Sequence, residues 1–156
     1  MTPISFSCKA HLAIAPTEIA EQILDISNWP DFKGYGPLPG IKSAEFEVKT
    51  PEVVGSRIRV QNTDRSLHVE EITEWLPESR VALRMQEFSA PLSWLATGID
   101  ETWEFEPVGG GTKVVRSFQL HTRSTMTRPL LWLISRLLKR AINRHLRQMS
   151  EHAPPQ

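Results

Sequence analysis

The stretch of sequence that decides the fold is Ile14-Ala-Pro-Thr-Glu-Ile-Ala-Glu-Gln-Ile-Leu-Asp-Ile-Ser-Asn-Trp-Pro-Asp-Phe32. Pro16 suits the first turn of a helix because it has no backbone N–H to leave unbonded there, and Glu18 suits the positive end of the helix dipole. Ile19 and Ile23 then recur at helical spacing. The stretch therefore predicts a helix from residue 15 to about residue 28, which the Trp-Pro-Asp-Phe segment ends and which a loop rich in glycine and proline follows.

Short runs of alternating apolar and polar residues flank this helix on both sides. One run precedes the helix at 5–14, and the others follow it at 44–48, 57–61, 67–75, 81–88, 94–106 and 112–121. Turn-forming residues separate these runs. Because the alternation has a period of two and the connections are short, it predicts an antiparallel sheet of about seven strands with one face buried.

The end of the chain is predicted to form a long amphipathic helix, from about Thr127 to Ser150. Its expected apolar face consists of Leu130, Ile134, Leu137, Leu138, Ala141 and His145. Basic and polar residues occupy the opposite side. Since each element has one face to bury, the order strand, helix, six strands, helix predicts an α+β fold in which a curved antiparallel sheet wraps around the C-terminal helix.

Two parts of the sequence resemble a known superfamily. The stretch from Ile14 to Phe32 is similar to the opening of START-like, Bet v 1-like (SRPBCC) proteins, and in particular of the polyketide cyclase/dehydrase and lipid-transport group. The segment Gly111-Thr-Lys-Val114, after Trp103-Glu-Phe105, resembles the penultimate hairpin of that family. The resemblance covers the whole chain. It implies one helix-grip domain over residues 1–156, with a cavity for an apolar or amphipathic small molecule between the sheet and the helix.

Proteins of that superfamily differ in function, so the resemblance alone implies several functions. We expect first a protein that binds or transports a small hydrophobic or amphipathic ligand, such as a lipid, a polyketide or an aromatic metabolite. One alternative is a cyclase or dehydratase-like enzyme that acts on a polyketide-type substrate. The other is an interaction module that uses the basic C-terminal helix.

Net charge and cysteine content indicate which kind of partner and which cellular compartment to expect. The 156 residues carry no formal net charge, which argues against a nucleic-acid-binding protein. The charge is nevertheless uneven, because residues 122–156 contain seven basic residues and one acid, whereas residues 1–121 contain 11 and 17. Cys8 has no second cysteine with which to form a disulfide, and the N-terminus does not resemble a signal peptide, so we expect a cytoplasmic location.

Familiar catalytic and metal-binding motifs are absent from the sequence. It contains no Gly-x-Ser-x-Gly, no His-Glu-x-x-His and no phosphate-binding glycine loop. The five histidines lack the paired spacing of zinc ligands, and one cysteine cannot make a zinc site. These histidines are His11, His68, His121, His145 and His152. The sequence predicts neither a metal nor a cofactor.

Arg116 is the first candidate for a polar side chain inside the cavity. It alternates with the apolar residues Val114 and Phe118, so it should share their inward face. The same parity argument places Glu71 and Glu87 on the inner face of their strands. A buried guanidinium needs a partner. Arg116 therefore pairs with one of these acids, or binds a carboxylate, phosphate or enolate of a ligand, and the sequence leaves both possibilities open.

The remaining candidate ligand contacts are aromatic residues and residues of the C-terminal helix. Trp29, Phe32 and Tyr35 lie in or before the loop expected at the mouth of the cavity. His145 is either a structural histidine or a general acid–base in the pocket. The candidate ligand-binding residues are Trp29, Phe32, Tyr35, Glu71, Glu87, Trp94, Arg116, Phe118, Leu130, Ile134, Leu138 and His145.

Trp132 and Leu133 are unexpected, because they project toward the basic side of the C-terminal helix. A preceding segment or a second copy of the chain could cover them, so a monomer and a homodimer both remain open. Alternatively, they insert into an anionic membrane surface while the nearby cations contact the head groups. The cations of this possible peripheral membrane contact are Arg136, Lys139 and Arg140.

Overall fold

The computed structural model describes residues 2–151. Its strands are β1 (Ile4–Leu12), β2 (Ile41–Val48), β3 (Arg57–Asn62), β4 (Leu67–Leu76), β5 (Arg80–Gln86), β6 (Ala96–Val108) and β7 (Gly111–Thr122). Its α-helices are α1 (Pro16–Leu24) and α2 (Arg128–Glu151), and two short 3-10 helices are η1 (Ile26–Asp31) and η2 (Leu92–Trp94). The predicted α+β fold class and the predicted order of elements are confirmed.

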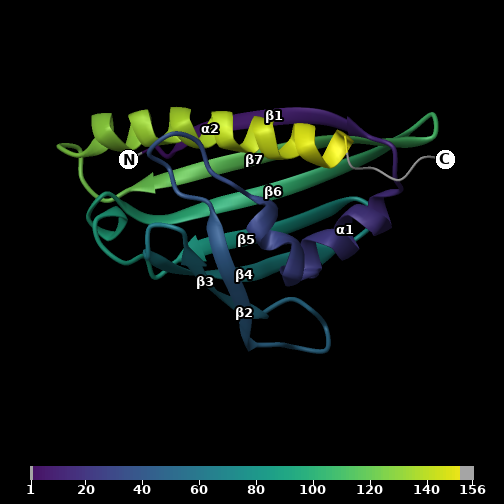
Figure 1. Ribbon diagram of the computed structural model, residues 1–156, viewed down its shortest axis with the longest axis horizontal. Helices are drawn as coiled ribbons and strands as arrows, with labels where there is room; N and C mark the ends of the chain where they lie inside the picture. The colour runs from purple at the N-terminus through teal and green to yellow at the C-terminus, as the bar shows by residue number, and fades with distance from the viewer. Residues whose placement is uncertain (1, 152–156) are drawn as a thin grey trace.

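The strands form one antiparallel sheet in the order β1-β7-β6-β5-β4-β3-β2. Each strand from β2 to β6 pairs with the next one along the chain, and β1 is added beside β7. Irregularities in the β2–β3, β4–β5 and β6–β7 registers bend the strands. Figure 1 shows α2 lying along β1 and β7, while β2 passes in front of the central strands. The sheet therefore curves around the space next to α2.

The helix α2 buries a different face from the one that the sequence predicts. The most deeply buried residues of α2 are Leu131, Ser135, Leu138, Ala141, Ile142 and Leu146. Leu130, which was expected in the core, is 52% exposed. The reason is that α2 has two apolar neighbours. One face packs on β1, where the Cys8 thiol lies 3.7 Å from the Lys139 carbonyl oxygen, and a second face contacts the cavity.

The segment from α1 to residue 40 covers one side of the cavity. The Trp29 indole N–H donates to the Ile23 carbonyl at 2.9 Å, and η1 packs against β2. Backbone hydrogen bonds between Tyr35 and Leu38 then close a tight turn. Gly34 adopts a φ of +76°, and a Cβ there would collide with the Leu38 carbonyl oxygen, so the turn requires glycine.

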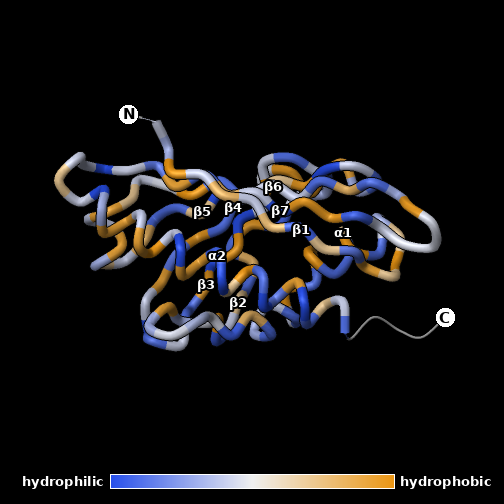
Figure 2. Tube along the Cα trace, turned by 90° about the horizontal axis from the view of Figure 1, so that it is seen from above, coloured by the Kyte–Doolittle hydropathy of each residue, from blue (hydrophilic) through white to orange (hydrophobic). Residues whose placement is uncertain are grey.

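Hydropathy follows this arrangement. Figure 2 shows hydrophobic and hydrophilic positions alternating along the strands and along α2. On the inner face of the sheet, Ile58, Val60 and Val81 have no exposed surface. Among residues 2–151 we find no helix with the length and apolar character needed to cross a membrane.

Candidate functional site

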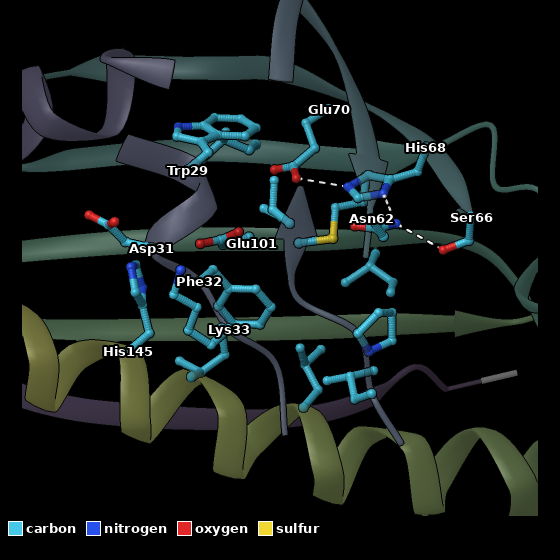
Figure 3. Close-up of a pocket in the computed structure, with 18 of the residues that line it drawn as sticks. Trp29, Asp31, Phe32, Lys33, Asn62, Ser66, His68, Glu70, Glu101 and His145 are labelled. Atoms are coloured by element: carbon cyan, nitrogen blue, oxygen red, sulfur yellow. Dashed lines mark hydrogen bonds and ion pairs between the residues drawn. The ribbon is translucent and has the colours of Figure 1, made fainter. Parts of the chain in front are cut away.

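A cavity of about 790 Å³ lies between the inner face of the sheet and α2. Leu83, Met85 and Ile99 contribute apolar wall from β5 and β6. Ile134 and Leu137 contribute it from α2, and η1 and the following loop complete the wall. Figure 3 looks into this space and shows that the polar side chains come from several different elements. The cavity is therefore mostly apolar, with polar groups at defined places.

Arg116, Glu101 and His145 form one polar cluster in the wall of the cavity. Arg116 Nε donates to Glu101 Oε2 at 2.6 Å, and Arg116 Nη1 donates to His145 Nδ1 at 3.0 Å. The guanidinium carbon lies 4.2 Å from the centre of the Trp103 ring, and the Trp103 indole N–H donates to the same Glu101 oxygen at 2.8 Å. The sheet register explains this meeting, because Arg116 lies opposite Trp103 and Glu101 is the next residue on the same face of β6.

Burial sets the protonation of this cluster. Burial raises the pKa of Glu101, while the attraction of Arg116 opposes that rise. Burial and the nearby Arg116 charge lower the pKa of His145 to about 3. Because the Arg116 N–H can only donate, His145 Nδ1 accepts and its proton lies on Nε2. His145 is therefore a neutral hydrogen-bonding group at neutral pH and carries no acidic imidazolium proton.

A second polar group, formed by Asn62, His68 and Glu70, lines the cavity from β3 and β4. His68 Nε2 lies 2.9 Å from Glu70 Oε2, and Asn62 Nδ2 lies 3.2 Å from His68 Nδ1. Asn62 Nδ2 also donates to the Ser66 hydroxyl at 3.1 Å. This chain of hydrogen bonds holds the buried Glu70 carboxyl group at the cavity wall.

Half of the candidate residues named from the sequence line the cavity. They are Trp29, Phe32, Arg116, Ile134, Leu138 and His145. Phe32 makes an edge-on contact with the His145 ring, at 5.7 Å between ring centres. The structure thus brings η1, β7 and α2 together around one space, as Figure 3 shows for Trp29, Phe32 and His145.

The parity predictions for Glu71 and Glu87 were wrong. Glu71 lies opposite Arg57 and Arg84 on the outer face, whereas Glu70 shares the inner face with Met85. β5 ends at Gln86, and the positive φ of Glu87 turns its side chain away from the strand alternation. Glu71 and Glu87 both pair with Arg57 outside the cavity. The acid partner of Arg116 is therefore Glu101.

Four further candidates lie outside the cavity wall. Trp94 is not on a strand, because the chain forms η2 before β6 begins, and it is 66% exposed. Tyr35 lies over the outer side of α2, where its hydroxyl meets Arg140 at 3.3 Å. Phe118 is buried in a stack with Phe6, with 5.0 Å between ring centres. Leu130, at the start of α2, also lies outside this wall.

Sequence reasoning missed the two buried acids, although part of the signal was present. Glu101 alternates with Ile99 and Trp103, and this is the same argument that singled out Arg116. Glu70 was hidden because Leu67 and Val69 made the opposite face of β4 look apolar. The side chain of Leu67 is in fact 46% exposed, at the edge where β4 begins.

Metal-binding geometry is absent from the part of the chain that the structure describes. No group of three or more His, Cys, Asp or Glu side chains within residues 2–151 could hold a metal ion. His152, one of the histidines considered above, lies outside the described residues. Cys8 is buried against α2, and this burial raises the pKa of its thiol.

Residues 3–153 match the protein family described as polyketide cyclase / dehydrase and lipid transport. The chain belongs to this family. Membership also agrees with the START-like, Bet v 1-like superfamily that the sequence resembles. The family includes ligand-binding and cyclase-type proteins, and small hydrophobic ligands are typical of it. No curated protein matches the chain.

Several solved structures share the fold of this chain. A START superfamily protein from Mycobacterium smegmatis has a TM-score of 0.66 at 12% identity, covering 93% of this chain and 98% of that one. Ginseng major latex-like protein 151 from Panax ginseng has a TM-score of 0.70 at 15% identity, covering 99% and 100%. The di-domain ARO/CYC BexL of the BE-7585A biosynthetic pathway has a TM-score of 0.72 at 14% identity, covering 99% and 51%. These similarities establish the helix-grip fold alone.

Proposed function

We propose that this protein binds or transports a small hydrophobic or amphipathic ligand, such as a lipid, a polyketide or an aromatic metabolite, in its cavity. The cavity itself carries the proposal. Its volume of about 790 Å³ lies within the range of roughly 300–1,000 Å³ that small-molecule sites occupy. Apolar side chains make up most of its wall, and each Å² of apolar surface removed from water contributes about 25 cal/mol.

The polar groups of the wall support a ligand that is apolar along most of its length and polar at defined points. His145 offers an N–H at Nε2, and Glu70 offers carboxyl oxygen at the opposite side of the space. Trp29, from η1, and Phe32, directly after η1, add aromatic surface against which a flat or chain-like ligand can pack. A few fixed polar groups in an apolar cavity orient a ligand without dominating its affinity.

Native mass spectrometry of the full chain, purified under mild conditions, tests the proposal. We expect an added mass that disappears on denaturation, and a small apolar molecule in the organic extract of the same sample. If the protein emerges without added mass, it is then incubated with long-chain lipids and polycyclic aromatic compounds. A chain that takes up none of these compounds contradicts the proposal.

A second candidate function is a cyclase or dehydratase-like activity on a polyketide-type substrate. The observation that favours it is a buried carboxyl group, Glu101, whose pKa is raised by burial at the cavity wall. Such a group can exchange a proton with a bound substrate. The structural similarity to a protein described as ARO/CYC agrees with this candidate.

The enzymatic candidate is tested by turnover of a short poly-β-keto thioester. The wild type should form a cyclised product faster than buffer does, and Glu101→Gln should lose most of this rate while it still binds the thioester. Conversion by the wild type at the rate of the buffer alone would remove the enzymatic candidate and leave the binding function in place.

A further inference from the structure

The inner part of the cavity contains more negative than positive groups. Glu70 is 5% exposed, Glu101 is 3% exposed and Arg116 is 7% exposed, so one guanidinium faces two carboxyl groups. Figure 3 shows Glu70 and Glu101 pointing into the same space, from β4 and β6. Arg116 is already engaged, because its Nε bonds Glu101 and its Nη1 bonds His145.

Among residues 2–151, no Lys or Arg forms an ion pair with Glu70. Its hydrogen-bond partner is His68, whose Nε2 lies 2.9 Å from Glu70 Oε2. The Glu70 charge also reaches the other acid, since it adds to the effect of burial in raising the pKa of Glu101. A carboxylate in a partly dry space is stabilised by donors and destabilised by further negative charge.

The outer part of the wall repeats this imbalance. Asp31 and Asp64 line it together with one base, Lys33. Over the whole wall, four acidic residues therefore face two basic ones. An anionic head group would meet one buried cation, Arg116, which already bonds Glu101 and His145. It would also lie close to the buried carboxyl groups of Glu70 and Glu101, where the local dielectric screens charges less than water does.

We infer, building on the proposed binding function, that the part of the ligand inside the cavity carries hydroxyl or amine hydrogen-bond donors and no negative charge. Donor groups can bond the free oxygen positions of Glu70 and Glu101, and charged acceptors make such hydrogen bonds strong. The inference selects alcohols, polyhydroxylated aromatics and amines as the ligand class. It excludes fatty acids and phosphate esters whose charged ends would enter the cavity.

A set of ligands with one chain length tests the inference. Dodecanol, dodecylamine and dodecanoate are titrated against the protein at mildly alkaline pH by displacement of an uncharged naphthylamine fluorophore. We expect dodecanol or dodecylamine to bind at least tenfold more tightly than dodecanoate, which corresponds to about 1.4 kcal/mol. Comparison of dodecanol with dodecylamine then shows whether the cavity prefers a neutral hydroxyl or an ammonium group.

Charge-neutralising variants identify the acid responsible. Glu70→Gln should narrow the difference in affinity between dodecanoate and dodecanol at least threefold, because it removes the negative charge. The Gln amide oxygen can still bond His68, so the wall should stay intact. Glu71→Gln is the matched control, since it removes the same charge one residue along β4 on the outer face. Equal or tighter binding of dodecanoate by the wild type would overturn the inference, and so would an equal effect of the two variants. Failure of the fluorophore and all three chains to bind would instead overturn the proposed function.

A second inference rests on the outer face of α2, which the cavity does not use. Leu133, Arg140, Arg144 and Arg147 are exposed on one stripe of the helix, and Trp132 is 51% exposed beside it. The ion pairs among residues 2–151 include no Lys or Arg of α2. Exposed apolar side chains at one end of a helix, followed by cations without acid partners, are typical of a helix that lies on an anionic membrane surface.

We propose that this face of α2 docks on an anionic lipid surface. Trp132 and Leu133 would enter the interface, while Arg136, Lys139 and Arg140 contact the head groups. Arg136 already lies 5.3 Å from the centre of the Trp132 ring, so the cation and the aromatic ring can act at the same depth. Leu130, with 52% of its surface exposed, extends the apolar end of the face.

Vesicle co-sedimentation tests this docking. The wild type should sediment with vesicles of phosphatidylcholine and phosphatidylglycerol, remain unbound with phosphatidylcholine alone, and dissociate at high salt. Arg140→Glu/Arg144→Glu and Trp132→Ser/Leu133→Ser should each weaken binding at least tenfold, whereas Lys113→Glu, an exposed residue of β7, should not. Unchanged binding by either double variant would overturn the proposal. It would also be overturned if Trp132→Ser/Leu133→Ser dissociated a dimer and left vesicle binding intact.

Discussion

Replacing Arg116 by Met tests the strength of the Arg116–Glu101 pair, because Met keeps the bulk of the stem and removes the charge. We expect the free energy of unfolding at neutral pH to fall by about 3–5 kcal/mol, since Glu101 then remains buried without a cation. Urea denaturation followed by circular dichroism measures the change. The bond to Glu101 makes this structural effect the expected one.

Two further variants control the Arg116 experiment. Arg116→Met combined with Glu101→Leu should recover at least half of the loss, because no unpaired buried charge remains. Arg59→Met, on the exposed outer face, should cost less than about 1 kcal/mol. A stability of Arg116→Met within about 1 kcal/mol of the wild type would show that Glu101 does not depend on the guanidinium.

His145 should remain neutral in the folded protein until the solution is strongly acidic. Its pKa is lowered from 6.5 to about 3, so the folded state binds the proton less readily than the unfolded state does. The stabilisation is complete above pH 6.5 and is lost as the pH falls toward 3. The raised pKa of Glu101 acts in the opposite direction, because it favours the folded state as the pH falls.

The imidazole signals of His145 in nitrogen-detected NMR measure this state directly. They should keep the neutral pattern, with the proton on Nε2, as the pH is lowered through 6.5 and until it approaches 3. In His145→Asn, which retains an acceptor for Arg116 and does not titrate, the melting temperature should fall less steeply in acid. A His145 midpoint near 6.5 would contradict the burial of this side chain beside Arg116.

At the scale of single residues, alternation predicted some orientations and not others. Arg116 lies between buried Val114 and Phe118 on the inner face, as strict alternation in a regular strand requires. Alternation could not place Glu87, because nothing in the local sequence indicates that β5 ends at Gln86. It misplaced Glu71, because the apolar residue Leu67 lies at an exposed strand end.

At the scale of elements, α2 was predicted in its extent but not in its rotation. The spacing of apolar residues along a helix gives one average apolar direction. In contrast, α2 contacts both β1 and the cavity. Ile134 and Leu137 belong to the cavity face, and Leu131 and Leu146 belong to the face that is fully packed. The division between the two faces depends on where the sheet curves, which no segment of sequence specifies by itself.

A pair of neighbouring substitutions tests this rotation. Leu131→Asp should lower the free energy of unfolding by more than about 3 kcal/mol, because it places a charge where the native side chain has no exposed surface. Leu130→Asp makes the same change one residue earlier, where the side chain is 52% exposed, and should cost less than about 1 kcal/mol. Thermal melts of the two variants compare them directly. Equal destabilisation, or a larger effect at Leu130, would contradict the observed rotation of α2.

At the scale of the whole molecule, the fold was predictable and the cavity wall was not. The order of elements and the motif from Ile14 to Phe32 were sufficient for the helix-grip fold, because seven short strands and one long helix have few ways to bury their apolar faces. The cavity instead depends on side chains from η1, β4, β6 and α2, which meet only after the sheet has curved. Its volume, and the meeting of Glu70 and Glu101 at one wall, therefore follow from the structure alone.

The binding of an uncharged naphthylamine fluorophore tests the central claim, that this cavity is a ligand site, most directly. Leu137 points to the cavity from α2, and Leu130 lies on the same helix outside it. Leu137→Trp should therefore fill part of the space, while Leu130→Trp makes the same change at the surface. Cooperative melting of both variants establishes that both are folded. We predict saturable binding by the wild type and by Leu130→Trp, and at least tenfold weaker binding by Leu137→Trp, or about 1.4 kcal/mol. Absence of saturable binding by the wild type, or equal affinity in the two variants, would contradict the account.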